Sequence, residues 1–104
     1  MIAVIFEVKI KPGKQRRYLS LAADLRPLLK DIEGFISIER FQSLSTEEKL
    51  LSLSWWENEE AVLQWKKNIS HKNAQQEGRG SIFDFYKISI VSLTREYSFD
   101  AESL

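Results

Sequence analysis

The chain has 104 residues, a length typical of one domain, and 43% of them are hydrophobic, so a packed core is expected. Its 15 basic and 15 acidic residues cancel to a formal net charge of zero, whereas nucleic-acid-binding domains usually carry a basic excess, so nucleic acid is not an expected partner. The absence of cysteine excludes disulfide bonds, a thiol nucleophile and cysteine-ligated metal sites.

The N-terminal segment alternates between apolar and other positions. Every even-numbered position of residues 2–10 is apolar, whereas Glu7 and Lys9 are charged, and this period of two predicts a half-buried strand. The apolar run at the N-terminus is too short for a signal-peptide core, and no stretch approaches a membrane span. We therefore expect a cytoplasmic protein that does not associate with membranes.

The spacing of apolar residues changes to three and four between Lys14 and Ile32, which predicts an amphipathic helix. Pro27 lies inside this segment. An interior proline removes a hydrogen bond and clashes with the preceding turn, so we expect a kink or a restart there. Gly34 suits the left-handed cap that ends such a helix.

Two further strands are predicted over Phe35–Leu44 and Lys49–Trp56, with residues 45–48 as the hairpin connection between them. Asn58 or Glu57 follows as the expected N-cap of a second helix.

The second helical region begins with a short apolar stripe of Ala61, Val62 and Trp65. Ser70 is predicted to cap another short helix, which ends near residues 78–80 because two glycines lie there.

The last predicted strand is Ile82–Tyr97, which is long and rich in aromatic residues. Its apolar face changes between Ile90 and Val91, which suggests a β-bulge or bend at that point. We expect residues 1–97 to form one domain and residues 98–104 to form a flexible C-terminal tail.

The predicted order of elements is βαββαβ, which indicates an α+β fold of ferredoxin-like type, an antiparallel four-stranded sheet with both helices on one face. The other face would then carry Phe35, Phe41, Leu50 and Trp56, or their opposites along each strand. Such a face is a larger apolar patch than monomers usually expose, so the pattern predicts a homodimer.

Several short segments within residues 2–97 match one known family. They are the opening strand, Pro12-Gly13, Gly34-Phe35-Ile36-Ser37, the run from Leu53 to Val62 with Trp65, Ser70-His71-Lys72 and Gln76-Glu77-Gly78-Arg79. Together they resemble the antibiotic biosynthesis monooxygenase (ABM) family. Members of this family are dimeric α+β barrels, and the resemblance implies a cofactor-independent monooxygenase that uses O₂ on a small aromatic or quinol-type substrate.

A haem-degrading branch of the same family is disfavoured by the residues present. That branch has an asparagine on the first strand, where this chain has Phe6, and a tryptophan on the second helix, which Trp65 matches. Gln75 stands near the position of its axial histidine, with His71 one turn earlier. Two of the three roles lack their residue, so no cofactor is expected.

His71 is the only histidine, and its ordinary pKa lies near neutrality. The resemblance implies that it acts as a general base on a phenol or hydroquinone, whose anion then gives an electron to O₂. The structural alternative is a surface or capping residue next to Ser70.

Three aromatic residues are candidates for binding the substrate, namely Trp65, Trp55 and Phe6. Each also fits ordinary core packing, and Trp55 and Trp56 lie on opposite sheet faces, so only one of these two lines a given cavity. The other tryptophan is expected at the dimer interface.

Arg79 and Tyr86 are candidates for orienting a substrate oxygen or stabilising an oxyanion. Arg79 also suits the end of a helix, and Tyr86 also suits sheet packing. Glycine-rich phosphate loops, GxSxG elbows and paired-histidine metal motifs are absent. The alternatives to the enzyme are a non-catalytic dimer that binds a small apolar ligand, and a haem-binding protein.

Overall fold

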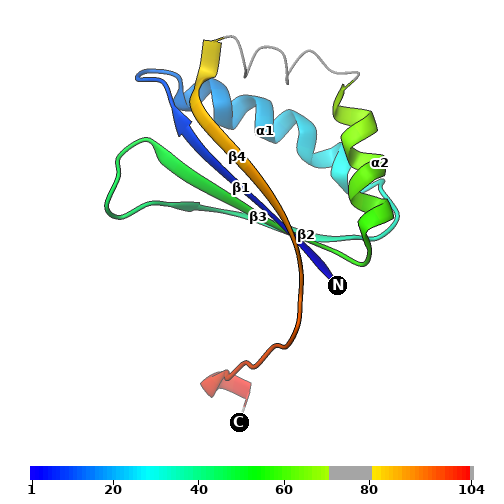
Figure 1. The fold of residues 1–104 in the computed structure, drawn as a ribbon. Helices are drawn as coiled ribbons and strands as arrows, with labels where there is room; N and C mark the ends of the chain where they lie inside the picture. Colours follow the sequence, from blue (N-terminus) through cyan, green and yellow to red (C-terminus); the bar gives the residue numbers. More distant parts are fainter. Residues whose placement is uncertain (71–80, 104) are drawn as a thin grey trace.

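The fold was obtained as a computed structural model that describes residues 1–70 and 81–103 (Figure 1). In chain order its elements alternate as βαββαβ, followed by a short 3₁₀ turn. They are β1 (Ile2–Ile10), α1 (Gln15–Leu29), β2 (Phe35–Gln42), β3 (Lys49–Trp56), α2 (Glu59–Ser70), β4 (Phe83–Ser92) and the turn Ala101–Ser103. This order confirms the predicted fold class.

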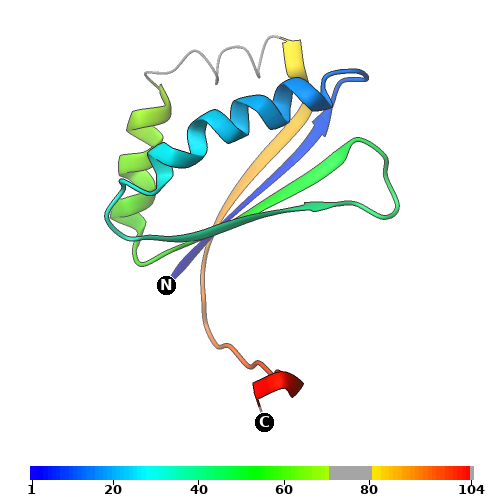
Figure 2. The same cartoon turned by 180° about the vertical axis from the view of Figure 1, so that it is seen from behind.

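The four strands form one antiparallel sheet in the order β2-β3-β1-β4, so β2 and β4 are its edges. Both helices lie on the same side of this sheet, as the two opposite views show (Figures 1 and 2). We call this side the helix-covered face and the other side the open face. The arrangement is the ferredoxin-like one that the sequence predicts.

The pairing register decides which side chains lie beneath the helices. Val8 pairs with Leu50 and Ile2 pairs with Trp56, and all of these except Ile2 are buried. The odd-numbered residues of β1 and β3 therefore point to the open face. The core consists of two clusters, one around Val8, Ile10, Tyr18, Leu50 and Ile82, and one around Leu29, Ile32, Trp56, Ala61 and Val62.

The prediction for α1 is wrong at Pro27, whereas the prediction for the start of α2 is confirmed. α1 passes through Pro27 without interruption, so the expected restart is wrong. Pro27 is only two residues from the end of α1, so a bend at the proline would change the direction of very few helical residues. At the start of α2, the side-chain oxygen of Asn58 accepts a hydrogen bond from the Ala61 N–H at 2.9 Å, which confirms Asn58 as the N-cap.

The strand β4 ends at Ser92 and not at Tyr97, so the predicted strand is too long. Ser92 pairs with Ile2, the first residue of β1, and no neighbouring strand extends beyond that point. The irregularity also lies elsewhere than predicted. The pairs of β1 with β4 skip Asp84, and the register then runs unbroken to Ser92.

After Ser92 the chain leaves the sheet and runs away from the body of the protein (Figures 1 and 2). The Leu93 N–H donates a hydrogen bond to the Met1 carbonyl oxygen at 3.0 Å. Within residues 1–70 and 81–103, no backbone hydrogen bond joins residues 94–100 to the sheet. The division between a domain of residues 1–97 and a flexible tail of residues 98–104 stays a prediction.

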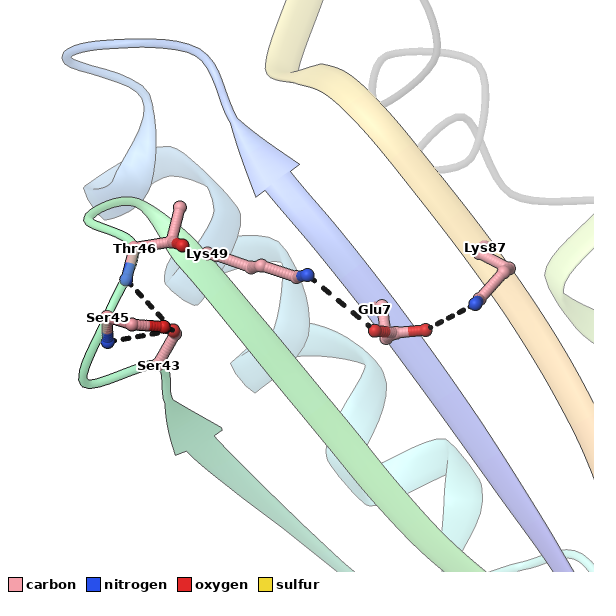
Figure 3. Close-up of polar contacts among 6 residues, drawn as sticks. All are labelled: Glu7, Ser43, Ser45, Thr46, Lys49 and Lys87. Carbon is pink, nitrogen blue, oxygen red and sulfur yellow. Dashed lines mark hydrogen bonds and ion pairs between the residues drawn. The ribbon is translucent and has the colours of Figure 1, made fainter.

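The connection between β2 and β3 covers residues 43–48 and is two residues longer than predicted. The Ser43 hydroxyl oxygen accepts hydrogen bonds from the N–H groups of Ser45 and Thr46, at 3.3 and 3.1 Å (Figure 3). Glu48 completes the turn with a φ of 62°, in the left-handed region. In the part of the chain that the structure describes, neither helix combines the length and the apolar character needed to cross a bilayer.

Candidate functional site

An aromatic cluster occupies the helix-covered face where β1 meets β4. Phe6 of β1 has its ring centre 5.9 Å from that of Phe83 and 6.0 Å from that of Tyr86. Tyr18 of α1 adds a fourth ring, 5.7 Å from Phe83. The aromatic cluster therefore joins β1, β4 and α1, with the edge-to-face and tilted contacts that aromatic rings favour.

The helix-covered side of β4 carries an apolar shelf, which consists of Tyr86, Ile88 and Ile90. They pair with Val8, Phe6 and Val4 of β1 and so share the side on which the helices lie. They are nevertheless 39%, 53% and 48% exposed. The buried clusters join the helices mainly to β1, β2 and β3, and among the described residues Phe83 is the one member from β4, next to Ile82. The shelf is therefore apolar surface beside the core.

Trp65 approaches the same side of the sheet from α2. Its half-buried ring packs against the cluster that contains Trp56, together with Val4 and Ile2 of β1. Val4 lies two residues before Phe6 on the same face of β1. Trp65 and the aromatic cluster are thus on one side of one strand, with Val4 between them.

Trp55 does not share this site with the other candidates. It pairs with Ala3, whereas Phe6 pairs with Ser52, so Trp55 lies on the open face. Trp56 is the tryptophan of β3 that faces the helices, and it is 1% exposed. A single helix-side site therefore holds Phe6, Tyr86 and Trp65 without Trp55.

The remaining two candidates, His71 and Arg79, lie outside the described residues. Their roles as general base and as orienting cation stay predictions. Ile88 and Ile90 were not among the predicted site residues, although their alternation with Tyr86 along β4 places them on its face.

The site is apolar where the structure describes it. Tyr86 carries the only titratable side chain on the helix-covered faces of β1 and β4 within the described residues, and these faces otherwise offer hydrocarbon and one serine, Ser92. The described ranges also contain no group of three histidine, cysteine or acidic residues suited to a metal ion. Phe6 stands among aromatic rings and has no group that can donate a hydrogen bond to haem. These residues do not fit the haem-degrading pattern.

A shallow hollow lies at the opposite edge of the sheet, beside the connection between β2 and β3. Its lining is mostly polar, whereas small-molecule sites are usually apolar with few polar groups, so we do not assign a ligand to it. The lining residues are Gln15, Gln42, Ser43, Leu44, Ser45, Glu47 and Glu48.

The open face carries charged side chains among its apolar ones, and three of them, Glu7, Lys49 and Lys87, lie together. The Glu7 carboxylate lies 3.0 Å from the Lys87 Nζ and 3.8 Å from the Lys49 Nζ (Figure 3). The hydrogen bond from Lys87 holds the pKa of Glu7 below its ordinary value, and the charges of Lys87 and Lys49 act in the same direction.

This ion pair predicts a change in stability with pH. A carboxyl with a lowered pKa in the folded state adds stability above its unfolded pKa, and that stability is lost as the pH falls through the folded value. We therefore expect Lys87→Met to flatten the fall in unfolding free energy below about pH 4.3, the ordinary pKa of a glutamate. The pKa of Glu7 should rise in this variant, as measured by NMR titration of its carboxyl carbon. Lys9→Met, also on the open face, is the control, and an equal effect of both variants would contradict the assignment.

Comparison with known proteins identifies relatives of the chain. Residues 1–77 match the family model described as Antibiotic biosynthesis monooxygenase. The chain is 38% identical over 94 residues to the protein named Jasmonate monooxygenase ABM from Pyricularia oryzae. This alignment covers 90% of the chain and 44% of the relative, so the chain spans less than half of that protein.

Solved structures share the fold at lower sequence identity. A conserved protein from Methanosarcina mazei Go1 superposes with a TM-score of 0.76 at 23% identity, over 86% of this chain and 89% of that one. SnoaB, a cofactor-independent oxygenase from Streptomyces nogalater, superposes with a TM-score of 0.77 at 7% identity, over 91% and 94% of the two chains.

Proposed function

Because the chain belongs to the antibiotic biosynthesis monooxygenase family, we propose that it is a cofactor-independent monooxygenase that oxidises a small aromatic or quinol-type substrate with O₂. The observation that carries the proposal is the exposed apolar shelf of β4 beside Phe6, on the helix-covered face. The 38% identity to a protein named as a monooxygenase supports the same reaction type.

The surroundings of the shelf suit a flat apolar ligand. Ile88 and Ile90 offer aliphatic surface, and the rings of Phe6 and Tyr86 are 6.0 Å apart. In this proposal Phe6 and Trp65 line the site, and the Tyr86 hydroxyl donates a hydrogen bond to a substrate oxygen. Contact with apolar walls removes water from the substrate, which strengthens that hydrogen bond.

The proposed reaction needs no external reductant, as a phenol illustrates. His71 removes the hydroxyl proton, and the phenolate passes one electron to O₂, which gives a phenoxyl radical and superoxide. These combine in a C–O bond at a ring carbon, and the base returns the proton to the peroxide. Loss of the proton on that carbon and cleavage of the O–O bond give a quinone and water. The substrate thus supplies all four electrons that O₂ accepts.

The two charged or titratable candidates outside the described residues complete the proposal. His71 acts as the base, and Arg79 stabilises the negative charge on the substrate oxygen as its proton leaves. Positioning of O₂ next to a desolvated phenolate supplies the remaining rate increase.

Oxygen consumption tests this function directly. With a panel of hydroquinones and phenols, we expect the protein to consume O₂ in proportion to the product formed. Loss of a general base costs typically about 10²–10⁴-fold in rate, so His71→Ala should lose at least 10²-fold in kcat. An oxygen electrode and mass spectrometry of the product, with ¹⁸O₂ as the label, provide the measurement.

Gln64→Ala provides the matched control, because Gln64 is an exposed residue of α2. It should retain the activity of the unchanged protein. Oxygen uptake that survives unchanged in His71→Ala would remove the proposed base. An absence of ¹⁸O in the product would contradict the monooxygenase reaction.

A second candidate function is a non-catalytic dimer that binds a small apolar ligand. It is favoured because the described residues on the helix-covered faces of β1 and β4 include a single titratable side chain, that of Tyr86. Saturable quenching of tryptophan fluorescence by a hydroquinone without oxygen uptake would support this function. A stoichiometric Soret band on titration with haem would instead support haem binding, against the misfit of Phe6.

We also propose that the protein works as a homodimer joined through the open face. Phe41, Phe85 and Val91 are 44%, 47% and 41% exposed on this face, and Trp55 belongs to it. Apolar surface on this scale is unusual for a monomer. The apolar residues of the open face are Ala3, Ile5, Phe41, Leu51, Leu53, Trp55, Phe85 and Val91.

A further inference from the structure

Among the described residues that pair on the helix-covered face of the sheet, Arg40 of β2 is the only one with a charged side chain. It pairs with Ser52 of β3, and Ser52 pairs on its other side with Phe6 of β1. Phe6 in turn pairs with Ile88 of β4. These four residues form one row across the sheet, so the positive charge lies in line with the ring and the apolar shelf of the proposed site.

The Arg40 side chain lacks the partners that a guanidinium needs. Its Nε atom is buried and donates no hydrogen bond to any described residue. The described ranges likewise contain no ion pair of Arg40 with a carboxylate. A guanidinium stays charged in proteins, and a buried N–H without an acceptor costs free energy. An acceptor from outside the chain would remove this cost.

Ser52 supplies a hydroxyl group beside Arg40. Residues that pair directly on one face have their Cβ atoms about 4.5–5.5 Å apart. Ser52 is 7% exposed, and its hydroxyl forms no hydrogen bond with the described part of the chain. Ser54, two residues later, differs because its hydroxyl oxygen accepts the hydrogen bond from Trp56. Arg40 and Ser52 are thus two neighbouring donors that both lack an acceptor.

The row lies between the two buried clusters of the core, and Ser52 and Ser54 belong to neither cluster. Val4 and Phe6 face the helices from β1, yet both are partly exposed. Because β1 has a strand on each side, the space between the sheet and the helices is what exposes these two side chains. Water therefore reaches the sheet at this row, and a bound ligand would displace it.

We infer that the substrate of the proposed reaction carries an acidic group, which binds to Arg40 and Ser52. The guanidinium and the hydroxyl hold a carboxylate, while the ring of the same molecule lies on Phe6 and the shelf. Neighbouring strands are about 4.8 Å apart, so the backbones of Arg40 and Phe6 are separated by about 10 Å. A long arginine side chain and a carboxylate on a short carbon chain together span this distance. The inference rests on the proposed function, because the phenolic end of the molecule occupies the proposed site.

An acidic group gives Arg40 a role in selecting the substrate. Arginine and a carboxylate can form two parallel hydrogen bonds, and charge makes these bonds stronger than neutral ones. A neutral analogue would leave the guanidinium without its acceptor. The site should therefore prefer an acid to a neutral molecule of the same shape.

The compounds 3-(4-hydroxyphenyl)propanoate and its carboxamide test this preference, because they differ only in the acidic group. Isothermal titration calorimetry with the full chain measures the Kd of each. The propanoate should bind about ten- to a hundredfold more tightly than the carboxamide, the effect typical of a hydrogen bond to a charged group. Arg40→Met should remove the preference. Arg26→Met, which changes an exposed arginine of α1, is the matched control and should retain it.

Two milder variants keep the inference testable if Arg40→Met folds poorly. Ser52→Ala removes one hydroxyl and should reduce the preference by about two- to tenfold, as expected for a single hydrogen bond. Arg40→Lys keeps the charge but loses the planar pair of donors. It should therefore weaken the preference without abolishing it.

NMR spectroscopy observes the Arg40 side chain directly. Its Nε–H signal is identified as the one that is missing from the spectrum of Arg40→Lys. Addition of the propanoate should shift this signal, because the Nε–H gains an acceptor. The carboxamide should leave the signal in place.

The outcomes separate this inference from the proposed function. Equal affinity of the unchanged chain for the two compounds overturns the acidic substrate, and so does a preference that survives in Arg40→Met. A chain that binds neither compound overturns it as well. The proposed function is judged separately, by oxygen uptake with hydroquinone, which has no acidic chain.

Discussion

Replacing Trp56 by alanine is expected to lower the free energy of unfolding by about 3–5 kcal/mol, the cost of removing a large aromatic side chain from a packed core. Trp56 is 1% exposed, and its ring centre lies 5.1 Å from that of Phe35 in an edge-to-face contact. The same cluster supports Trp65. Urea unfolding followed by circular dichroism measures the change, and we expect a lower midpoint with a similar slope.

The Trp56 ring is also held by a hydrogen bond that can be tested separately. Its Nε1–H donates to the Ser54 hydroxyl oxygen at 2.9 Å, and both residues are buried. Ser54→Ala leaves that N–H without this acceptor, which costs about 1–3 kcal/mol. Ser20→Ala, at an exposed position on α1, is the control.

A loss below about 1 kcal/mol for Trp56→Ala would mean that the ring is not part of the core.

The sequence predicts the bounds of a strand accurately where a neighbouring strand pairs with it along its whole length. The period of two locates β1 and β3 at the bounds that the structure gives, Ile2–Ile10 and Lys49–Trp56. The end of β4 depends instead on the first residue of β1, which lies far earlier along the chain. Residues 93–97 continue the apolar pattern of β4, but β1 has no residue in the sheet to pair with them.

The assignment of faces is harder, because both sides of this sheet are apolar. Alternation separates Trp55 from Trp56 but does not decide which of them meets the helices. The structure places Ser52 and Ser54 on the helix-covered face, against the usual rule that the more polar side faces water. Small side chains at these positions leave room for the large rings of Phe6 and Trp56.

The site likewise combines local and long-range information. The sequence singles out Phe6 and Tyr86 one by one as aromatic residues on strands. Their ring contact arises from the pairing of β1 with β4, whose register includes a skipped residue at Asp84. A residue skipped in one strand changes every later pair, and no local pattern in the sequence marks it here.

Gly34→Ala is expected to lower the free energy of unfolding by about 2–4 kcal/mol through two separate effects. Gly34 has a φ of 94°, which residues with a side chain rarely adopt. A methyl group there would also lie 2.9 Å from the Cβ of Ala61, which is 3% exposed. The Gly34 carbonyl oxygen accepts a hydrogen bond from the Glu57 N–H at 2.8 Å, so this segment cannot move away without losing that bond.

Gly13 separates the two effects, since it has a similar φ of 81° and no atom lies within 4 Å of the place that an alanine methyl group would take. Gly13→Ala should therefore cost only the backbone strain, about 1–2 kcal/mol, minus a small gain from the less flexible unfolded chain. The difference between the two variants in thermal or urea unfolding measures the contact with Ala61. Because Ala61 starts the apolar stripe of α2 that carries Trp65, Gly34→Ala should also shift the tryptophan emission, whereas Gly13→Ala should not. Equal losses for the two variants would show that α2 does not pack tightly on the segment that joins α1 to β2.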